Sequence, residues 1–164
     1  MYKIKLLILL LISSFFISCT SNKIQDSQNQ YSVSYIGNEF DGLLLDNLIV
    51  NHMKALDLYD PSSELEINLT ITHSSGVYIT NTDNTSDREK ITSSSIFSVI
   101  DKKKECVAYS ENITNSQFFI YASSDKFLSN QAAVKRIKQK NTEEIVRKII
   151  LILKNQNFEC KIKN

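Results

Sequence analysis

Glycine and histidine are scarce in this chain of 164 residues, and their scarcity excludes several kinds of site. The three glycines stand far apart, at Gly37, Gly42 and Gly76, so no glycine-rich loop is present to cradle a phosphate group. The two histidines, His52 and His73, belong to no H-E-x-x-H motif, and no Cys-x-x-Cys pair occurs. We therefore expect neither a metal ion nor a cofactor.

Excess charge of either sign is also missing. The chain has 19 Lys and Arg residues against 18 Asp and Glu residues, a net charge of +1. Residues 1–18 contain two lysines and no acid, so removing them leaves 17 basic and 18 acidic residues and a net charge of −1. This balance lacks the basic footprint of a nucleic-acid-binding protein, and we expect no nucleic-acid partner.

No catalytic motif is visible in the sequence. Serines are abundant, but none lies in the G-x-S-x-G context of a nucleophile elbow. Carboxylate pairs that only the fold brings together leave no trace in a sequence. The expectation is that the protein is not an enzyme.

A long apolar run is present at the N-terminus. Lys3 and Lys5 precede a continuous apolar stretch from Leu6 to Ile12. A membrane-spanning helix needs roughly 20 apolar residues, so this shorter run is typical of a secretory signal peptide. The following Phe16-Ile17-Ser18-Cys19 resembles the lipobox of bacterial lipoproteins, with Phe16 at a position where leucine is usual.

The lipobox resemblance implies a signal peptide at residues 1–18 and a lipidated tether at 19–29. Cleavage before Cys19 would make this cysteine the mature N-terminus and the site of acylation, and durable anchoring needs more than one acyl chain. Thr20 follows the cysteine in place of aspartate, which by analogy with lipoprotein sorting favours the outer membrane. An ordinary secreted protein with a chance cysteine, or an uncleaved membrane helix, are the alternatives.

Two cysteines remain after Cys19. An oxidising periplasm permits a disulfide between Cys106 and Cys160, which would tie the C-terminal tail to the domain. Two free thiols are the alternative, because spacing alone does not show whether the side chains meet.

Hydrophobic periodicity predicts one α+β domain at residues 30–155, followed by a C-terminal tail at 156–164. Alternating segments predict strands, and apolar steps of three and four predict helices. The element order β-α-β-β-β-α predicts a mostly antiparallel four-stranded sheet with two helices packed on one face. The predicted elements are a strand at 30–36, a helix at about 40–58, strands at 64–72, 88–100 and 105–114, and a helix at about 129–154.

Three details of this outline remain open. Asn141-Thr142-Glu143-Glu144 resembles a helix start, so the last helix is either continuous or divided near Asn141. The segment Ile149–Leu153 is apolar all round, which predicts burial on more than one side. The segment Phe118–Tyr121 is predicted to lead out of the sheet.

The sequence concentrates positive charge at Lys102, Lys103 and Lys104, immediately after Asp101. The plain interpretation is the solvated tip of a charged hairpin. The functional interpretation is a contact for the phosphate groups of an anionic glycolipid, or for an acidic loop of a partner.

The overall arrangement resembles the LPS-assembly lipoproteins (LptE) in their shorter alphaproteobacterial form. The shared pattern is a lipobox, a short strand, a helix, a long alternating strand, a hairpin, and a polar-aromatic passage into a long final helix. The closest echoes are Leu44-Leu45-Asp46-Asn47-Leu48, Tyr121-Ala122-Ser123-Ser124 and Asn130-Gln131-Ala132-Ala133.

This resemblance implies a non-catalytic, periplasm-facing subunit of the outer membrane. Members of the family sit within or against a large β-barrel that inserts lipopolysaccharide into the outer leaflet, and they act as plug and assembly factor. The implied partners are that barrel, the membrane through the N-terminal lipid, and lipopolysaccharide itself. Phe118–Tyr121 and Ile149–Leu153 are candidate contacts. A scaffolding or regulatory lipoprotein for a cell-wall synthase or a secretin is the alternative.

Overall fold

The computed structural model describes residues 29–34, 39–78, 88–120 and 127–160. The predicted signal peptide, Cys19 and most of the tether therefore lie outside the described residues, as does Tyr121. The predicted α+β fold with the order β-α-β-β-β-α is confirmed. The elements are β1 (Ser32–Val33), α2 (Glu39–Ala55), β2 (Leu65–Tyr78), β3 (Arg88–Asp101), β4 (Cys106–Ile120) and α3 (Phe127–Asn155).

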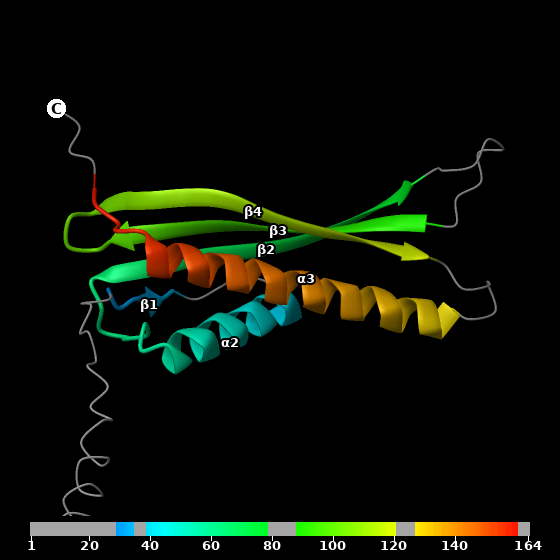
Figure 1. Ribbon diagram of the computed structural model, residues 1–164, viewed down its shortest axis with the longest axis horizontal. Coiled ribbons are helices and arrows are strands. Elements are labelled where there is room, and N and C mark those ends of the chain that lie inside the picture. Colours follow the sequence, from blue (N-terminus) through cyan, green and yellow to red (C-terminus); the bar gives the residue numbers. More distant parts are fainter. Residues whose placement is uncertain (1–28, 35–38, 79–87, 121–126, 161–164) are drawn as a thin grey trace, which may run out of the picture.

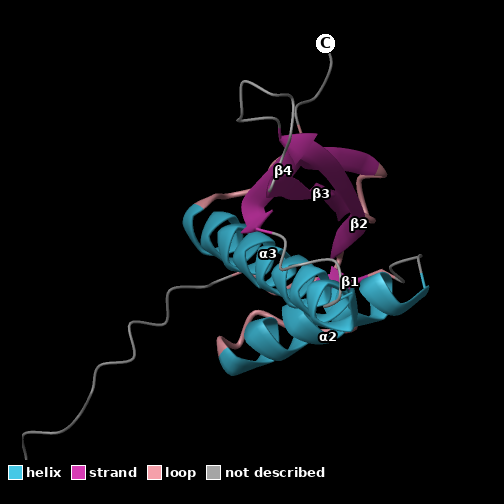
Figure 2. Ribbon diagram, turned by 90° about the vertical axis from the view of Figure 1, so that its right-hand side faces the viewer, coloured by secondary structure: helices cyan, strands magenta, loops and turns pink. Residues whose placement is uncertain are grey.

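The four strands form one mixed sheet in the order β1-β2-β3-β4. The short edge strand β1 runs parallel to β2, while β2, β3 and β4 form an antiparallel meander. Both helices lie on the same side of this sheet (Figure 1), and the sheet curves around α3 when seen from its end (Figure 2). α3 contacts β3 and β4, while α2 contacts α3 and β2.

Strict alternation gives the sheet two different faces. Along β2, the side chains of Ile67, Leu69 and Ile71 are buried, while the side chains of Asn68 and Thr70 between them are exposed. A strand places successive side chains on opposite faces, so the apolar set faces the helices and the polar set faces away from them. The hydrophobic core formed between the sheet and the helices also includes Leu45, Ile49, Met53, Phe97, Val99, Ile113, Ile145, Val146 and Ile149.

Helix α2 ends at Ala55 and not at Leu58 as predicted. Asp57 has a positive φ of 57°, and the N–H of Leu58 donates to the carbonyl of Met53 at 2.9 Å. This is the hydrogen-bonding pattern of a Schellman cap, in which a left-handed residue, usually glycine, ends the helix. Aspartate adopts that conformation more readily than most residues do. Because no glycine marks the helix end and the apolar stripe continues to Leu58, the sequence predicts a longer helix.

Strand β4 extends to Ile120, so the prediction that residues 118–120 lead out of the sheet is wrong. Lys90 pairs with Phe118, and Arg88 pairs with Ile120. Phe119 is buried on the helix side, while Phe118 and Ile120 are 54% and 61% exposed on the other face. Because Phe118, Phe119 and Ile120 are all apolar, the sequence does not show which of them faces the helices. The pairing with β3 determines that Phe119 does.

Helix α3 is continuous through Asn141, so the alternative of two helices is wrong. Asn141 is fully buried, and its amide bridges the helix to the sheet. Its Nδ2 donates to the carbonyl of Ile91 at 3.2 Å, and its Oδ1 accepts from Nδ2 of Asn115 at 3.0 Å. Asn141, which resembles a helix N-cap in the sequence, therefore connects the helix to the sheet by hydrogen bonds.

The C-terminal end of α3 is buried broadly but not all round. Ile149, Ile150 and Leu153 are buried, whereas Leu151 is 58% exposed. Ile149 and Ile150 point to different sides of the helix, so the predicted burial on more than one side is confirmed, and Leu151 is the exposed residue of the segment.

The segment after α3 packs onto the domain. Phe158 is 7% exposed, and its ring lies 5.9 Å from the ring of Tyr31 and 5.4 Å from that of Tyr109. Edge-to-face aromatic contacts of this kind add to the stabilisation from burial. Residues 156–160, expected as the start of a tail, thus close the core at the β1 end of the sheet.

We predict that Asn141→Ala lowers the free energy of unfolding by about 2–4 kcal/mol, because it leaves the Asn115 amide and the Ile91 carbonyl without their buried partner. Urea unfolding followed by circular dichroism measures this change. Lys140→Ala, one position earlier on the exposed side of α3, is the matched control and should change stability by less than about 0.5 kcal/mol. Equal effects of the two substitutions would contradict the assigned role of Asn141.

Candidate functional site

The sheet face turned away from the helices carries a continuous set of small polar side chains. We call it the polar face. Its cross-strand rows include Thr70–Ile96–Asn112 and Thr72–Ser94–Thr114. The polar face comprises Asn68, Thr70, Thr72 and Ser74 on β2, Thr92, Ser94, Ile96 and Ser98 on β3, and Ser110, Asn112, Thr114 and Ser116 on β4.

The polar face carries no charged side chain among these twelve positions. Its hydroxyl and amide groups offer both donors and acceptors, and they also bond one another: Ser94 Oγ donates to Asn112 Oδ1 at 2.7 Å. Ile96, at the centre, is 58% exposed. The face is therefore a neutral hydrogen-bonding surface with one apolar side chain in its middle.

Charged residues bound the polar face at both ends. Lys90 and Arg88 lie opposite the exposed Phe118 and Ile120 at the far end of the β3–β4 hairpin. Glu66 lies at the other end, beside the lysine turn. The neutral zone is thus confined to the middle of the sheet.

The lysine turn, Lys102–Lys104, joins β3 to β4. Each of its three ammonium groups has an acidic neighbour, so the turn is not an unpaired cationic patch. Exposed ion pairs contribute little stability, typically about 0–1 kcal/mol, which applies to the pairs of Lys102 and Lys103, whereas the side chain of Asp101 is only 11% exposed. The pairs are Lys102–Glu66 at 3.8 Å, Lys103–Glu64 at 3.5 Å and Lys104–Asp101 at 3.4 Å.

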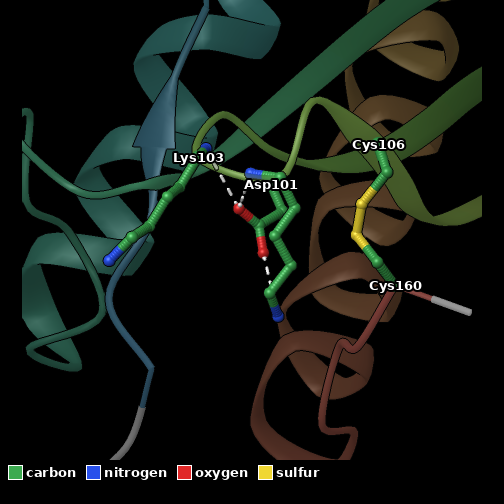
Figure 3. Close-up of a disulfide and its surroundings, with 5 residues drawn as sticks. Asp101, Lys103, Cys106 and Cys160 are labelled. Carbon is green, nitrogen blue, oxygen red and sulfur yellow. Dashed lines mark hydrogen bonds and ion pairs between the residues drawn. A yellow bond between two sulfur atoms is a disulfide. The ribbon is translucent and has the colours of Figure 1, made fainter. Parts of the chain in front are cut away.

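The carboxylate of Asp101 organises the turn. It accepts hydrogen bonds from the backbone N–H groups of Lys103 at 3.1 Å and Lys104 at 2.9 Å (Figure 3). The bond from Lys104 is the main reason that the pKa of Asp101 is lowered from its ordinary value. This Asp-based turn allows a tight connection although no glycine is present, with Glu105 at a positive φ of 51°.

The two cysteines meet beside this turn. Cys106 is the first residue of β4, Cys160 follows α3, and a disulfide joins them (Figure 3). Their Cα atoms are 6.2 Å apart, within the usual range for disulfides. The bond and the buried Phe158 together fix the C-terminal segment against the sheet.

A cavity of about 460 Å³ lies near the other end of the helical layer, between α2, α3 and the inner face of the sheet. Leu44, Val134 and Phe119 supply apolar wall from α2, α3 and β4 respectively. His73 from β2 and Lys138 from α3 supply polar groups. No sequence motif marks this cavity, because its wall is assembled from four elements that are far apart in the sequence.

His73 is the most unusual group in the cavity wall. Its side chain is 5% exposed; Nδ1 lies 2.7 Å from Ser93 Oγ, and Nε2 lies 3.7 Å from Asp41 Oδ2. Burial lowers the pKa of His73 from its ordinary 6.5, Asp41 opposes that shift, and the positive charge of Lys138 adds to it.

The Ser93–His73–Asp41 cluster unites residue types that hydrolases use. Ser93 is fully buried on the inner face of β3 and does not line the cavity, so its hydroxyl is not placed to attack a bound substrate. Sequence reasoning missed this cluster, whose members come from three elements. The direct cross-strand pair His73–Ser93 was the one signal available, through strand register.

His52 lies apart from the cavity, exposed on α2, with Nδ1 2.8 Å from the carbonyl oxygen of Leu48. Among the described residues, no group of three His, Cys, Asp or Glu side chains is arranged to hold a metal ion. Within the same part of the chain, no helix is both long enough and apolar enough to cross a membrane. Cys19, the predicted lipidation site, lies outside the described residues.

Comparison with known proteins shows the fold alone. No family model and no curated protein sequence matches the chain. Rare lipoprotein B from Shewanella oneidensis is similar in structure, with a TM-score of 0.53 and 14% identity over 75% of this chain and 95% of that one. A minor lipoprotein from Acinetobacter baumannii has a TM-score of 0.58 and 9% identity over 77% and 91% of the two chains. A lipoprotein B from Nitrosomonas europaea gives a TM-score of 0.57 and 9% identity over 77% and 82%.

We predict that replacing both Cys106 and Cys160 by serine destabilises the domain. The two cysteines are separated by 54 positions, and cross-linking over that length stabilises by roughly 4 kcal/mol in the chain-entropy model. Non-reducing gels and thiol titration test the bond, and thermal unfolding with and without reductant tests its effect. Unchanged mobility on reduction together with two titratable thiols would refute the bridge.

We also predict that His73 makes stability depend on pH. The groups facing it are Asp41 from α2, Lys138 from α3 and Ser93 from β3. Because its folded pKa lies below 6.5, the unfolded chain binds the proton more readily, and stability present above pH 6.5 is lost as the pH falls toward the folded pKa, by up to about 1.4 kcal/mol per pH unit.

Urea unfolding of the protein and of His73→Gln, between pH 5 and pH 7.5, measures that loss. The variant should lose this part of the pH dependence, whereas His52→Gln, at the exposed histidine, should keep it. If the free energy of unfolding of His73→Gln depends on pH as strongly as that of the unmodified protein, another group is responsible for the effect.

Proposed function

We propose that this protein is a non-catalytic, lipid-anchored lipoprotein of the outer membrane, facing the periplasm, and that it serves as plug and assembly subunit of the β-barrel that inserts lipopolysaccharide. The observation that carries this proposal is the polar face: a neutral hydrogen-bonding sheet surface that no described helix covers. The LPS-assembly lipoproteins, which the chain resembles in its pattern of elements, have such a barrel as partner.

The polar face is chemically suited to the inside of a barrel. The lumen of an outer-membrane barrel is lined by polar side chains, because these alternate with the lipid-facing ones along each strand. Serine, threonine and asparagine can exchange hydrogen bonds with such a wall. A neutral face also avoids burying unpaired charge, which costs far more than burying a paired hydroxyl or amide.

Two features support the rigid presentation of this face. The disulfide and Phe158 fix the end of α3 to the sheet near the lysine turn, and Asn141 ties the middle of the helix to Ile91 and Asn115. A surface held in one shape loses little conformational entropy on docking, which favours a stable complex.

Anchoring rests on the predicted acylation of Cys19. Solved lipoproteins share the fold of this chain, which supports an exported, lipid-anchored protein. The proposed contact of Lys102, Lys103 and Lys104 with glycolipid phosphates requires those groups to replace Glu66, Glu64 and Asp101 as ion-pair partners.

The test is affinity purification of the tagged, lipidated protein in mild detergent, with and without Ile96→Arg. Ile96 is 58% exposed at the centre of the polar face, so the substitution leaves the core intact and places a charge where the barrel would dock. Leu151→Arg is the matched control, since Leu151 is an equally exposed aliphatic residue on the helical layer.

We expect a large outer-membrane β-barrel to co-purify in stoichiometric amount with the unmodified protein and with Leu151→Arg, and to be lost with Ile96→Arg. Loss only with Leu151→Arg would contradict the assignment of the interface to the polar face. A cell-wall synthase or a secretin in place of the barrel would favour the scaffolding or regulatory alternative.

A further inference from the structure

We propose that the cavity between α2, α3 and the inner face of the sheet binds a single-chain anionic lipid, with its apolar chain against Leu44, Val134 and Phe119 and its anionic oxygen head beside Lys135 and Lys138. This inference goes beyond the proposed function, because it concerns the helical layer and does not depend on which partner covers the polar face.

The size and wall of the cavity fit an apolar chain. Its volume of about 460 Å³ falls within the range of small-molecule sites, roughly 300–1,000 Å³. Most of the accessible surface area of the wall is apolar. Both helices and two strands contribute to the wall. Apolar wall left in contact with water costs about 25 cal/mol per Å², and an apolar chain removes that cost on binding.

The inner face of the sheet explains why the cavity lies at this end. At the β1 end, Ile67, Leu69 and Phe97 fill the space beneath the helices. Farther along, two buried inward positions of β3 carry the small polar side chains of Ser93 and Ser95. Serine is smaller than the isoleucine, leucine and phenylalanine side chains near β1, so the sheet supplies less apolar volume beneath the helices at this end.

The charge of the cavity wall favours an anion. Among the described residues of the wall, two are basic, Lys135 and Lys138, and one is acidic, Asp41. His73 adds no positive charge near neutral pH, because burial lowers its pKa. The described residues of the wall therefore sum to a net positive charge, beside amide groups of Gln131 and Gln139 that can donate hydrogen bonds.

One face of α3 presents both parts of the site. Gln131, Val134, Lys135 and Lys138 follow one another at helical steps of three, one and three, which places them on one side of the helix. Between Phe127 and Asn141 this helix has four basic residues and no acidic one. An apolar residue flanked by two cations on one helix face matches a molecule that joins an apolar chain to an anionic head.

The experiment uses the full chain in isolated membranes and a photoactivatable fatty acid that carries a diazirine on its chain. After illumination and purification, mass spectrometry of the peptides locates the label. We expect the label on α2 around Leu44 and on α3 between Gln131 and Lys138.

Two pairs of variants separate the chain from the head. Val134→Trp should fill the cavity and abolish most of the labelling, whereas Leu151→Trp, on the exposed side of the same helix, should not. Lys135→Gln with Lys138→Gln should reduce labelling at least about tenfold, equivalent to about 1.4 kcal/mol, since both cations beside the anionic head are removed. Lys140→Gln with Lys154→Gln removes the same charge from exposed positions of α3 and should leave labelling unchanged.

A fatty alcohol with the same diazirine chain tests the need for the anionic head. It should label weakly and should not respond to the Lys135 and Lys138 substitutions. Competition with an unlabelled fatty acid and with an anionic lysophospholipid then shows whether the site prefers a carboxylate or a phosphate head group. Label on other segments, or labelling that neither pair of variants changes, would overturn the proposal, as would equal labelling by acid and alcohol. A melting temperature for each variant ensures that the folded protein is compared.

Discussion

The structure depends on one packing constraint: two helices cover one face of a long antiparallel meander and leave the opposite face bare of any described helix. Period-two alternation along β2 and β3 makes this possible, because most inward residues near β1 are apolar and most outward residues are polar, with the exposed Ile96 as the central exception. Burial of the inward set holds α3 in place. The outward set is left as a neutral surface of hydroxyl and amide groups, and this division separates the face proposed to meet a partner from the layer that provides stability.

The helical layer itself is held differently at its two ends. Near β1 the core is apolar and closed by Phe158 and the Cys106–Cys160 disulfide. Farther along α3, hydrogen bonds from Asn141 replace apolar contact, His73 is buried beside Ser93, and a cavity remains. A protein that needed only stability would fill this volume, since each unfilled cavity costs free energy. The polar inward residues and the cavity therefore mark the part of the helical layer where we propose that a lipid binds.

The fold class follows from the sequence because it rests on periodicity. Alternation from Leu65 to Thr72 and the apolar stripes of the helices identify the layers and their order. Element ends and the cavity depend on contacts between distant residues. Asp57 caps the end of helix α2, and a glycine there would have been recognised as a helix end. In the run Phe118–Ile120, only the pairing with β3 shows which side chain faces the helices. Asn141 looks like a helix cap because its partners, Ile91 and Asn115, lie on other elements.

Radical footprinting in intact outer membranes tests the central claim most directly, because exposed apolar side chains of similar accessibility lie on both layers. Ile96 and Phe118, on the sheet face turned away from the helices, are 58% and 54% exposed; Leu43 and Leu151, on the helices, are 59% and 58% exposed. If the polar face docks against a partner, Ile96 at its centre and Phe118 at its edge become strongly protected in the membrane relative to the purified protein, while Leu43 and Leu151 react equally in both. Protection of the helical pair with full reactivity of Ile96 and Phe118 would contradict the account.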